Sequence, residues 1–224
     1  MVRHLHPYWS TGCVSRLKAI SRGNRVVKKT VNSQSKMRGY SIVELLVSLA
    51  VISIFSAIAV PSLVRTYRSY QMDDAASQVA GILKFTRYEA IRRNNAINCL
   101  NKGQNGTLTM FTDNVAAGGA GNGVVDASER RIIFPATAVA TLVDSGAVSN
   151  AGSLTAAVNA GALTTMSPSN GTISFDGRGA KTVPAGTSVY WVGNAVYGWR
   201  AVTVMPSGSI QVWSSATGTW KQLS

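Results

Sequence analysis

The hydrophobic and polar positions of this chain change their period twice along its length. Residues 45–64 form a run of twenty positions without a charge, and the run is apolar on nearly every face of a helix. At about 1.5 Å per residue, a helix of this length spans roughly 30 Å, the hydrocarbon thickness of a bilayer. We therefore expect residues 40–64 to form a membrane-spanning helix.

The helical period continues after this run, but only one face remains apolar. Over residues 65–95, apolar positions recur every three or four residues, while most charged positions fall on other faces. This pattern predicts one helix from about Ser41 to about Arg93, whose second half buries a stripe against a globular head. The stripe comprises Met72, Ala75, Ala76, Val79, Ile82, Leu83, Thr86 and Ala90.

Beyond residue 95 the pattern becomes one of strands and turns. Short β-rich runs alternate with Gly, Asn, Asp and Pro, whereas residues 115–123 and 144–162 contain few bulky side chains and predict surface loops. One long helix with many short strands indicates an α+β fold, in which the helix packs on an antiparallel β-sheet or β-sandwich head formed by residues 96–224. The expected strands cover residues 96–100, 107–111, 131–134, 172–175, 188–192, 199–205 and 209–213.

A single carboxylate, Glu44, stands at the start of the apolar run. Ser41 and Glu44 fit a capping box, in which both side chains satisfy backbone groups at the start of a helix. Such a cap explains Glu44 without any further function. A carboxylate in apolar surroundings nevertheless costs about 2.5–3.5 kcal/mol or more unless it is paired, which leaves room for a second role.

The residues around Glu44 resemble a known family. Gly39-Tyr40-Ser41-Ile42-Val43-Glu44-Leu45 is similar to the cleavage and methylation site of type IV prepilins and pseudopilins. The resemblance implies that a prepilin peptidase cuts after Gly39 and methylates Tyr40, the new N-terminus. It also implies that Glu44 pairs with the N-terminus of a neighbouring subunit during assembly, and that Pro61 kinks or loosens the helix.

Later segments resemble the GspH/FimT subfamily of these proteins. They are residues 83–94, 122–129, 173–179 and 202–208. The resemblance implies a pilin-like fold, relative to which residues 144–165 look like a flexible insertion. Its implied partners are the prepilin peptidase, other pilins or pseudopilins, and an inner-membrane assembly platform with its motor ATPase. The subunit would cross the bacterial inner membrane once, with a cytoplasmic N-terminus and a periplasmic head, before it joins a fibre.

The charge distribution favours a leader that is removed. Residues 1–39 hold nine of the 22 Lys and Arg residues and none of the nine Asp and Glu residues, so most of the net charge of +13 lies there. A basic leader fits the positive-inside rule. Because residues 1–26 show no helical or strand period, one hypothesis is that translation starts at Val27, Val31 or Met37. The other is an intact, long leader.

The expected mature chain lacks the side chains of the common catalytic sites. Both histidines, His4 and His6, lie in the leader, so no imidazole remains for a catalytic triad or a histidine metal site. Asp73 and Asp74 are adjacent on the helix and should solvate its surface. We therefore expect a protein that is not an enzyme and holds no cofactor. Cys99, the one cysteine left after processing, should be a small buried residue.

An acidic turn offers a weaker metal-site alternative. Asp113, Asn122, Asp126 and Glu129 could supply oxygen ligands to calcium, although the ligand spacing of an EF-hand is absent. The competing interpretation is a turn at Asn122-Gly123 with exposed acids, and it leaves the chain without a metal site.

Two functional classes remain. We expect a minor pilin or pseudopilin of either a type IV pilus or a type II secretion system, which the sequence does not separate. The alternative is a DNA-binding minor pilin for natural transformation. Residues 208–211, Gly-Ser-Ile-Gln, lack both arginines of the Gly-Arg-x-Arg element of FimT-like pilins, which disfavours nucleic acid as a partner. A second basic patch, or else scattered surface charges, would comprise Arg178, Lys181, Arg200 and Lys221.

Overall fold

The computed structural model describes residues 39–104, 107–114, 121–134, 140–215 and 218–223. The chain forms two compact units, which meet between residues 46 and 47. Helix α1 spans Ile42–Arg93, close to the predicted bounds. Ser41 caps this helix, because its backbone carbonyl accepts a hydrogen bond from the Leu45 N–H at 3.2 Å and its hydroxyl accepts one from the Val43 N–H at 3.4 Å. The leader, residues 1–38, lies outside the described residues.

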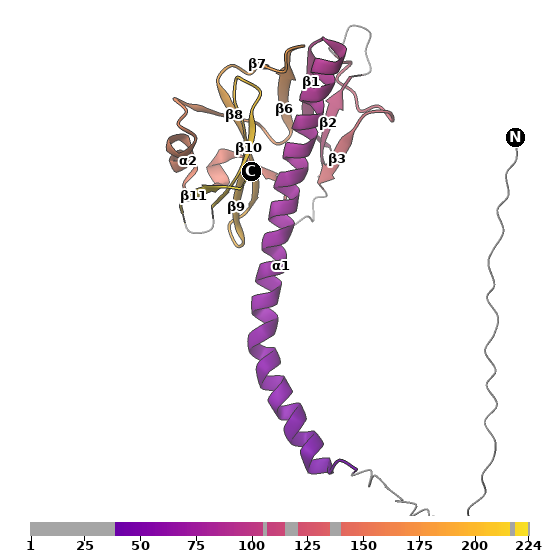
Figure 1. The fold of residues 1–224 in the computed structure, drawn as a ribbon, viewed down its shortest axis with the longest axis vertical. Coiled ribbons are helices and arrows are strands. Elements are labelled where there is room, and N and C mark those ends of the chain that lie inside the picture. The colour runs from indigo at the N-terminus through magenta and orange to yellow at the C-terminus, as the bar shows by residue number, and fades with distance from the viewer. Residues whose placement is uncertain (1–38, 105–106, 115–120, 135–139, 216–217, 224) are drawn as a thin grey trace, which may run out of the picture. The chain divides into compact units, whose positions relative to one another are not determined.

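The two halves of α1 differ in burial as the sequence predicts. Residues 47–66 are exposed in their unit, and α1 continues through Pro61 without a break (Figure 1). Farther along the helix, the whole predicted stripe is buried, from Met72 to Ala90. The second half of α1 is therefore a core element of the head. The effect of Pro61 on assembly stays a prediction.

Two sheets form the head (Figure 1). The first has the order β3 (Arg131–Phe134), β2 (Thr107–Asp113), β1 (Ile97–Gln104), β6 (Asn170–Phe175) and β7 (Lys181–Val183). The second has the order β11 (Trp220–Gln222), β10 (Ile210–Ser215), β9 (Gly198–Val204), β8 (Thr187–Asn194) and β4 (Leu142–Val143). These neighbours pair antiparallel, as predicted, while the short β5 (Leu163–Thr165) pairs with β8 in parallel.

The second sheet is covered on both faces. Alternate residues of its strands point to opposite sides, so Tyr190 and Val202 join the core shared by α1 and the first sheet, while Trp191 and Ala201 join a second core. The second core also contains Leu154 and Val158 of helix α2, and Figure 1 shows α2 on the side of this sheet away from α1.

The loop predicted over residues 144–162 is wrong in its secondary structure. This segment contains the 3₁₀ helix η1 (Ser145–Ala147) and the helix α2 (Ala151–Val158), and it leads into β5. Leu154 is fully buried, and Val158, four residues later, lies on the same helical face. The segment is thus a packed element that covers one face of the second sheet. Residues 115–120, from the other predicted loop, lie outside the described residues.

Candidate functional site

The residues at the predicted processing site precede α1 and are accessible. Gly39 and Tyr40 lie outside the helix, and Tyr40 is 76% exposed. A Cβ added at Gly39 would meet nothing within 4 Å. The folded subunit itself therefore does not require a glycine at this position, so any requirement for one must come from a molecule that acts on this bond.

Glu44 lies in the first turn of α1, beside these residues. Gly39, Tyr40, Ser41 and Glu44 line one shallow hollow. A carboxylate is favoured in the first turn because the backbone N–H groups there carry partial positive charge. The structure thus brings the three residues singled out at the N-terminus, Gly39, Tyr40 and Glu44, to a single exposed place.

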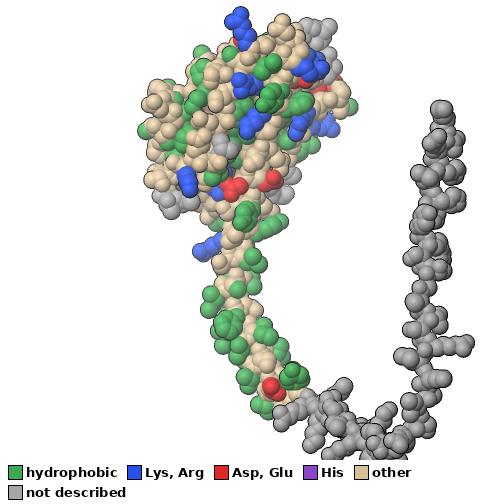
Figure 2. All heavy atoms as spheres, in the orientation of Figure 1, with side chains coloured by type: hydrophobic (Ala, Val, Ile, Leu, Met, Phe, Trp, Pro, Cys, Tyr) green, Lys and Arg blue, Asp and Glu red, His purple; other side chains and the backbone are tan. Residues whose placement is uncertain are grey.

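The first half of α1 presents an apolar surface. An 18-residue window of this helix has a mean hydropathy of 2.5, and none of the window is buried. Figure 2 shows hydrophobic side chains along this part of the helix and few charged ones. By length and composition the helix is long and apolar enough to cross a membrane. Such a surface also suits packing against other apolar helices.

The acidic turn is organised around its own backbone. Asn122 and Gly123 donate backbone N–H bonds to the Asp113 carboxylate at 2.9 and 2.7 Å. The Glu129 carboxylate accepts the N–H groups of Asn114 and Asp126 at 2.9 and 3.0 Å. Because Asp113 and Glu129 are only 1% and 5% exposed, the expectation of exposed acids is wrong for these two.

These bonds leave the acidic turn poorly suited to calcium. The side-chain amide of Asn122 donates to the Asp126 carboxylate at 2.9 Å, so Asp126 also accepts a hydrogen bond from within the turn. Gly121 adopts φ +74°, and a Cβ there would lie 1.9 Å from the Asp113 carboxyl carbon. Within the described residues, no group of three or more His, Cys, Asp or Glu side chains could hold a metal ion. The Asp113 and Glu129 carboxylates instead hold the acidic turn together through their bonds to backbone N–H groups.

The end of α1 docks onto two turns, in residues 176–180 and 205–209. Arg87 donates from Nε to the Gly179 carbonyl at 2.9 Å. Gly208 adopts φ +79°, and a Cβ there would lie 1.9 Å from the same carbonyl oxygen. The Asp176 carboxylate accepts the N–H groups of Arg178 and Ala180, both at 2.9 Å, and so shapes the first turn. These segments position the helix, which is a structural role.

A carboxylate with two cationic partners marks the C-terminal turn of α1. Glu89 pairs with Arg92 at 2.5 Å and with Arg93 at 2.7 Å. Hydrogen bonding to Arg92 is the main reason that the pKa of Glu89 falls to about 2. Arg93 also donates to the Asn114 carbonyl at 2.8 Å, which ties the helix end to the acidic turn.

Two of the four cations proposed as a basic patch are buried. Arg200 and Lys181 are only 4% and 7% exposed. They therefore belong neither to a basic surface patch nor to scattered surface charges, and both expectations are wrong for these two residues. Arg200 pairs with Asp73, which therefore has a tertiary role beyond solvating the helix surface. Lys181 donates to the Ser188 hydroxyl at 2.8 Å, and burial lowers the pKa of its ammonium group. The exposed members, Arg178 and Lys221, do not make a four-cation site.

The expected burial of Cys99 is confirmed. Its side chain is fully buried, and burial raises the pKa of the thiol to about 12. A thiol with this pKa is a poor nucleophile at neutral pH.

Comparisons with known proteins centre on the N-terminus and the fold. Residues 34–60 match the prokaryotic N-terminal methylation motif. Among curated proteins, none matches the chain. Two solved structures of the type IV minor pilin FimU from Pseudomonas aeruginosa strain PAO1 are similar to it. The P21 crystal form has 16% sequence identity and a TM-score of 0.42, over 68% of this chain and 93% of FimU. The P65 form has 17% identity and a TM-score of 0.39, over 67% and 95%.

Proposed function

We propose that this chain is a type IV pilin-like protein, a minor pilin or pseudopilin of the GspH/FimT type that assembles into a type IV pilus or a type II secretion pseudopilus. One observation carries the proposal. The matched motif, residues 34–60, includes the start of α1, and α1 is apolar through residue 64 and exposed through residue 66 before it becomes the core helix of a folded head. Such a subunit is suited to lie in a bilayer first and in a fibre of packed helices afterwards.

Processing would convert the exposed N-terminal segment into a charged helix end. Hydrolysis of the bond between Gly39 and Tyr40 by a prepilin peptidase leaves a free α-amine on Tyr40, which the peptidase then methylates. The accessibility of both residues supports this step. The methylated amine remains a cation, and it lies four residues before Glu44 along the chain.

Assembly would use this pair of opposite charges between subunits. A carboxylate and an amine that are both transferred into an apolar bundle lose their hydration, which costs several kcal/mol per ion unless they meet. Placing Glu44 of one subunit against the Tyr40 amine of its neighbour lowers that cost only at one axial position. The contact would therefore set the register of the subunits in the fibre.

The proposed topology follows from the same segment. The basic leader would stay in the cytoplasm, the apolar half of α1 would cross the inner membrane, and the head would lie in the periplasm. The proposed partners are the prepilin peptidase, the lipid bilayer before assembly, the inner-membrane assembly platform, and other pilins or pseudopilins.

Mass spectrometry of the protein from its native membrane tests the proposal. We expect a mature chain that begins with N-methylated Tyr40. The Gly39→Val variant should retain its leader, whereas Gly146→Val should be processed normally because Gly146, like Gly39, has open space around its Cβ position. Normal maturation of Gly39→Val, or wild-type protein that still begins upstream of Tyr40, would refute the proposal. Deletion of the gene then distinguishes the two fibres, by loss of surface pili or by loss of secreted proteins.

A further inference from the structure

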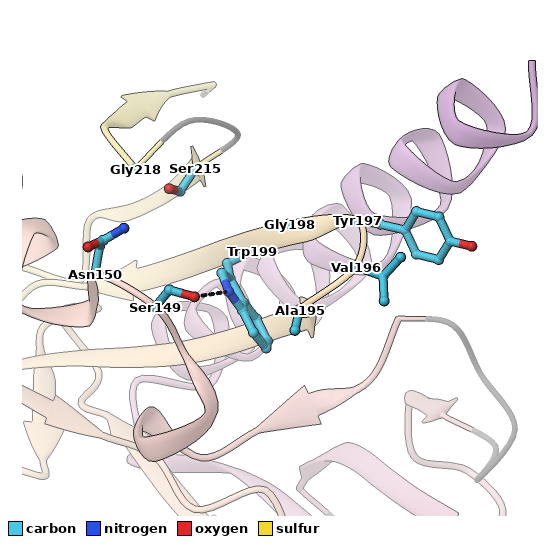
Figure 3. A pocket seen from close by; sticks show the side chains of 9 residues that line it. All are labelled: Ser149, Asn150, Ala195, Val196, Tyr197, Gly198, Trp199, Ser215 and Gly218. Carbon is cyan, nitrogen blue, oxygen red and sulfur yellow. Dashed lines mark hydrogen bonds between the residues drawn. The ribbon is translucent and has the colours of Figure 1, made fainter. Parts of the chain in front are cut away.

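A pocket on the head is lined by none of the residues used in the proposed assembly. It lies between the tip of the β8–β9 hairpin, the residues before α2, and the end of β10 (Figure 3). Its volume is about 280 Å³. That is just below the roughly 300–1,000 Å³ of typical ligand clefts, so the pocket suits a ligand the size of a single ring.

The pocket is lined by uncharged groups. Ser149, Asn150 and Ser215 contribute two hydroxyls and an amide, and Trp199, which is 6% exposed, contributes a small aromatic surface. Arg200, which follows Trp199 in the chain, has its charge already paired with Asp73. A charged ligand would lose hydration here without gaining a counter-charge, which disfavours phosphates, carboxylates and ammonium groups.

Asn150 has hydrogen-bonding capacity that the fold leaves unused. It stands at the N-cap of α2, where asparagine normally accepts a hydrogen bond from the first turn. Here it adopts a left-handed conformation with φ 62° and makes no side-chain cap bond. Across the described part of the chain its side-chain amide makes no other hydrogen bond, and Figure 3 shows it directed toward Gly218 across the pocket.

The two serines add to this unused capacity. Ser215 also lines the pocket, and its hydroxyl can both donate and accept hydrogen bonds. The Ser149 oxygen accepts the Trp199 indole N–H at 3.2 Å, which leaves its own O–H free to donate (Figure 3). Donors and acceptors therefore converge from two sides of the pocket.

We propose that this pocket binds one neutral sugar residue of a glycan. A neutral sugar offers hydroxyls that both donate and accept, which matches the Asn150 amide and the Ser149 and Ser215 hydroxyls. Its apolar C–H groups can contact the small exposed part of the Trp199 ring. The pocket would give a fibre subunit the ability to hold a carbohydrate surface, independently of how the subunit is processed or assembled.

Saturation-transfer NMR on the full chain tests this proposal. The chain is placed in phosphatidylcholine nanodiscs, because glycoside detergents would compete for the pocket. The probes are free glucose, galactose, mannose, fucose, N-acetylglucosamine and N-acetylgalactosamine, with glucuronic acid and glucosamine as charged counterparts. We expect at least one neutral sugar to bind with millimolar affinity and the charged counterparts to bind more weakly.

Two asparagines make a matched pair of variants. Asn150 and Asn159 flank α2, and both are left-handed, with φ 62° and φ 54°, so glycine fits either backbone without strain. Asn150→Gly should weaken sugar binding about tenfold, as expected for the loss of an amide that hydrogen-bonds the ligand, while Asn159→Gly should bind like the wild type. Ser215→Ala should also weaken binding and provides a second test should Asn150→Gly fail to fold. The proposal is overturned if no neutral sugar binds, if the charged sugars bind equally well, or if the folded pocket variants bind like the wild type.

Discussion

Arg200 of β9 and Asp73 of α1 form an ion pair that joins the second sheet to the long helix. The Arg200 Nε lies 2.5 Å from the Asp73 Oδ1, and the Arg200 side chain is 4% exposed against 39% for Asp73. The other guanidinium nitrogens donate to the Ser69 hydroxyl at 3.0 Å and the Trp199 carbonyl at 3.1 Å. Every nitrogen of this buried cation is therefore occupied.

Asp73→Asn should destabilise the head, because it leaves the Arg200 charge buried without its counter-charge. Breaking a fully buried pair costs about 3–5 kcal/mol, and the partial exposure of Asp73 reduces the expected loss to about 1–3 kcal/mol. Asp74→Asn is the matched control, since Asp74 is exposed and, among the described residues, accepts a side-chain hydrogen bond from Gln78 alone. Chemical denaturation of the full chain measures both variants. Equal stability of the two would contradict the assigned role of Asp73.

Gly208→Ala should be among the most damaging small substitutions in the head. The new Cβ would lie 1.9 Å from the Gly179 carbonyl oxygen, so the turn that holds the end of α1 must move. Gly186→Ala is the control, because Gly186 has a similar φ of +77° but nothing within 4 Å of the Cβ position.

The control variant should lose only about 1 kcal/mol, the cost of a left-handed alanine. Gly208→Ala should lose several times more, because it adds a steric clash to that strain. Thermal unfolding distinguishes these outcomes, and similar losses in the two variants would show that the close approach to Gly179 is unimportant.

The long helix could be predicted because its signals are local and periodic. The apolar run and the stripe from Met72 to Ala90 repeat with the helical period over many turns, and α1 begins within one residue of the prediction. Cys99 and the main strands followed from the same kind of pattern. The N-terminal motif was also readable, because its chemistry lies within a few consecutive residues.

The missed features depend on contacts between distant residues. Helix α2 is rich in Ala, Gly and Ser, and only Leu154 and Val158 show that one of its faces is buried. The edge strands β4, β7 and β11 have two or three residues each, too few to show an alternating pattern. Arg200 and Asp73 are far apart in sequence, so their pairing was invisible before the fold. The pocket beside Asn150 was missed for the same reason.

Acid should weaken the C-terminal end of α1 through Glu89. The pKa of this carboxylate is lowered from 4.5 to about 2 in the folded chain, chiefly by Arg92. The unfolded chain therefore takes up this proton first as the pH falls. The stabilisation is complete above about pH 4.5 and is lost progressively toward about pH 2.

Glu89→Gln isolates this contribution. The variant should be less stable than the wild type at neutral pH, and the difference should shrink as the pH falls through the window of the Glu89 titration. Unfolding free energies measured from neutral pH to about pH 2 check this expectation. A difference that stays constant with pH would show that the Glu89 charge does not stabilise the helix end.

Glu44→Ala should separate the two roles open to this carboxylate. If Glu44 pairs with the amine of a neighbouring subunit, the variant should be cleaved and methylated normally but enter fibres at least about tenfold less, since each 1.4 kcal/mol of lost pairing corresponds to a factor of ten. Ser41→Ala is the matched variant. It removes the hydroxyl that accepts the Val43 N–H but keeps the carboxylate.

Helix capping alone predicts similar effects for the two substitutions, because each removes one half of the same cap. Pairing between subunits predicts a large defect for Glu44→Ala and a small one for Ser41→Ala. The amounts of each variant in sheared fibres and in the membrane fraction, compared at equal expression, decide between them. Wild-type incorporation of Glu44→Ala would remove the pairing step from the proposed assembly and leave Glu44 as a helix cap.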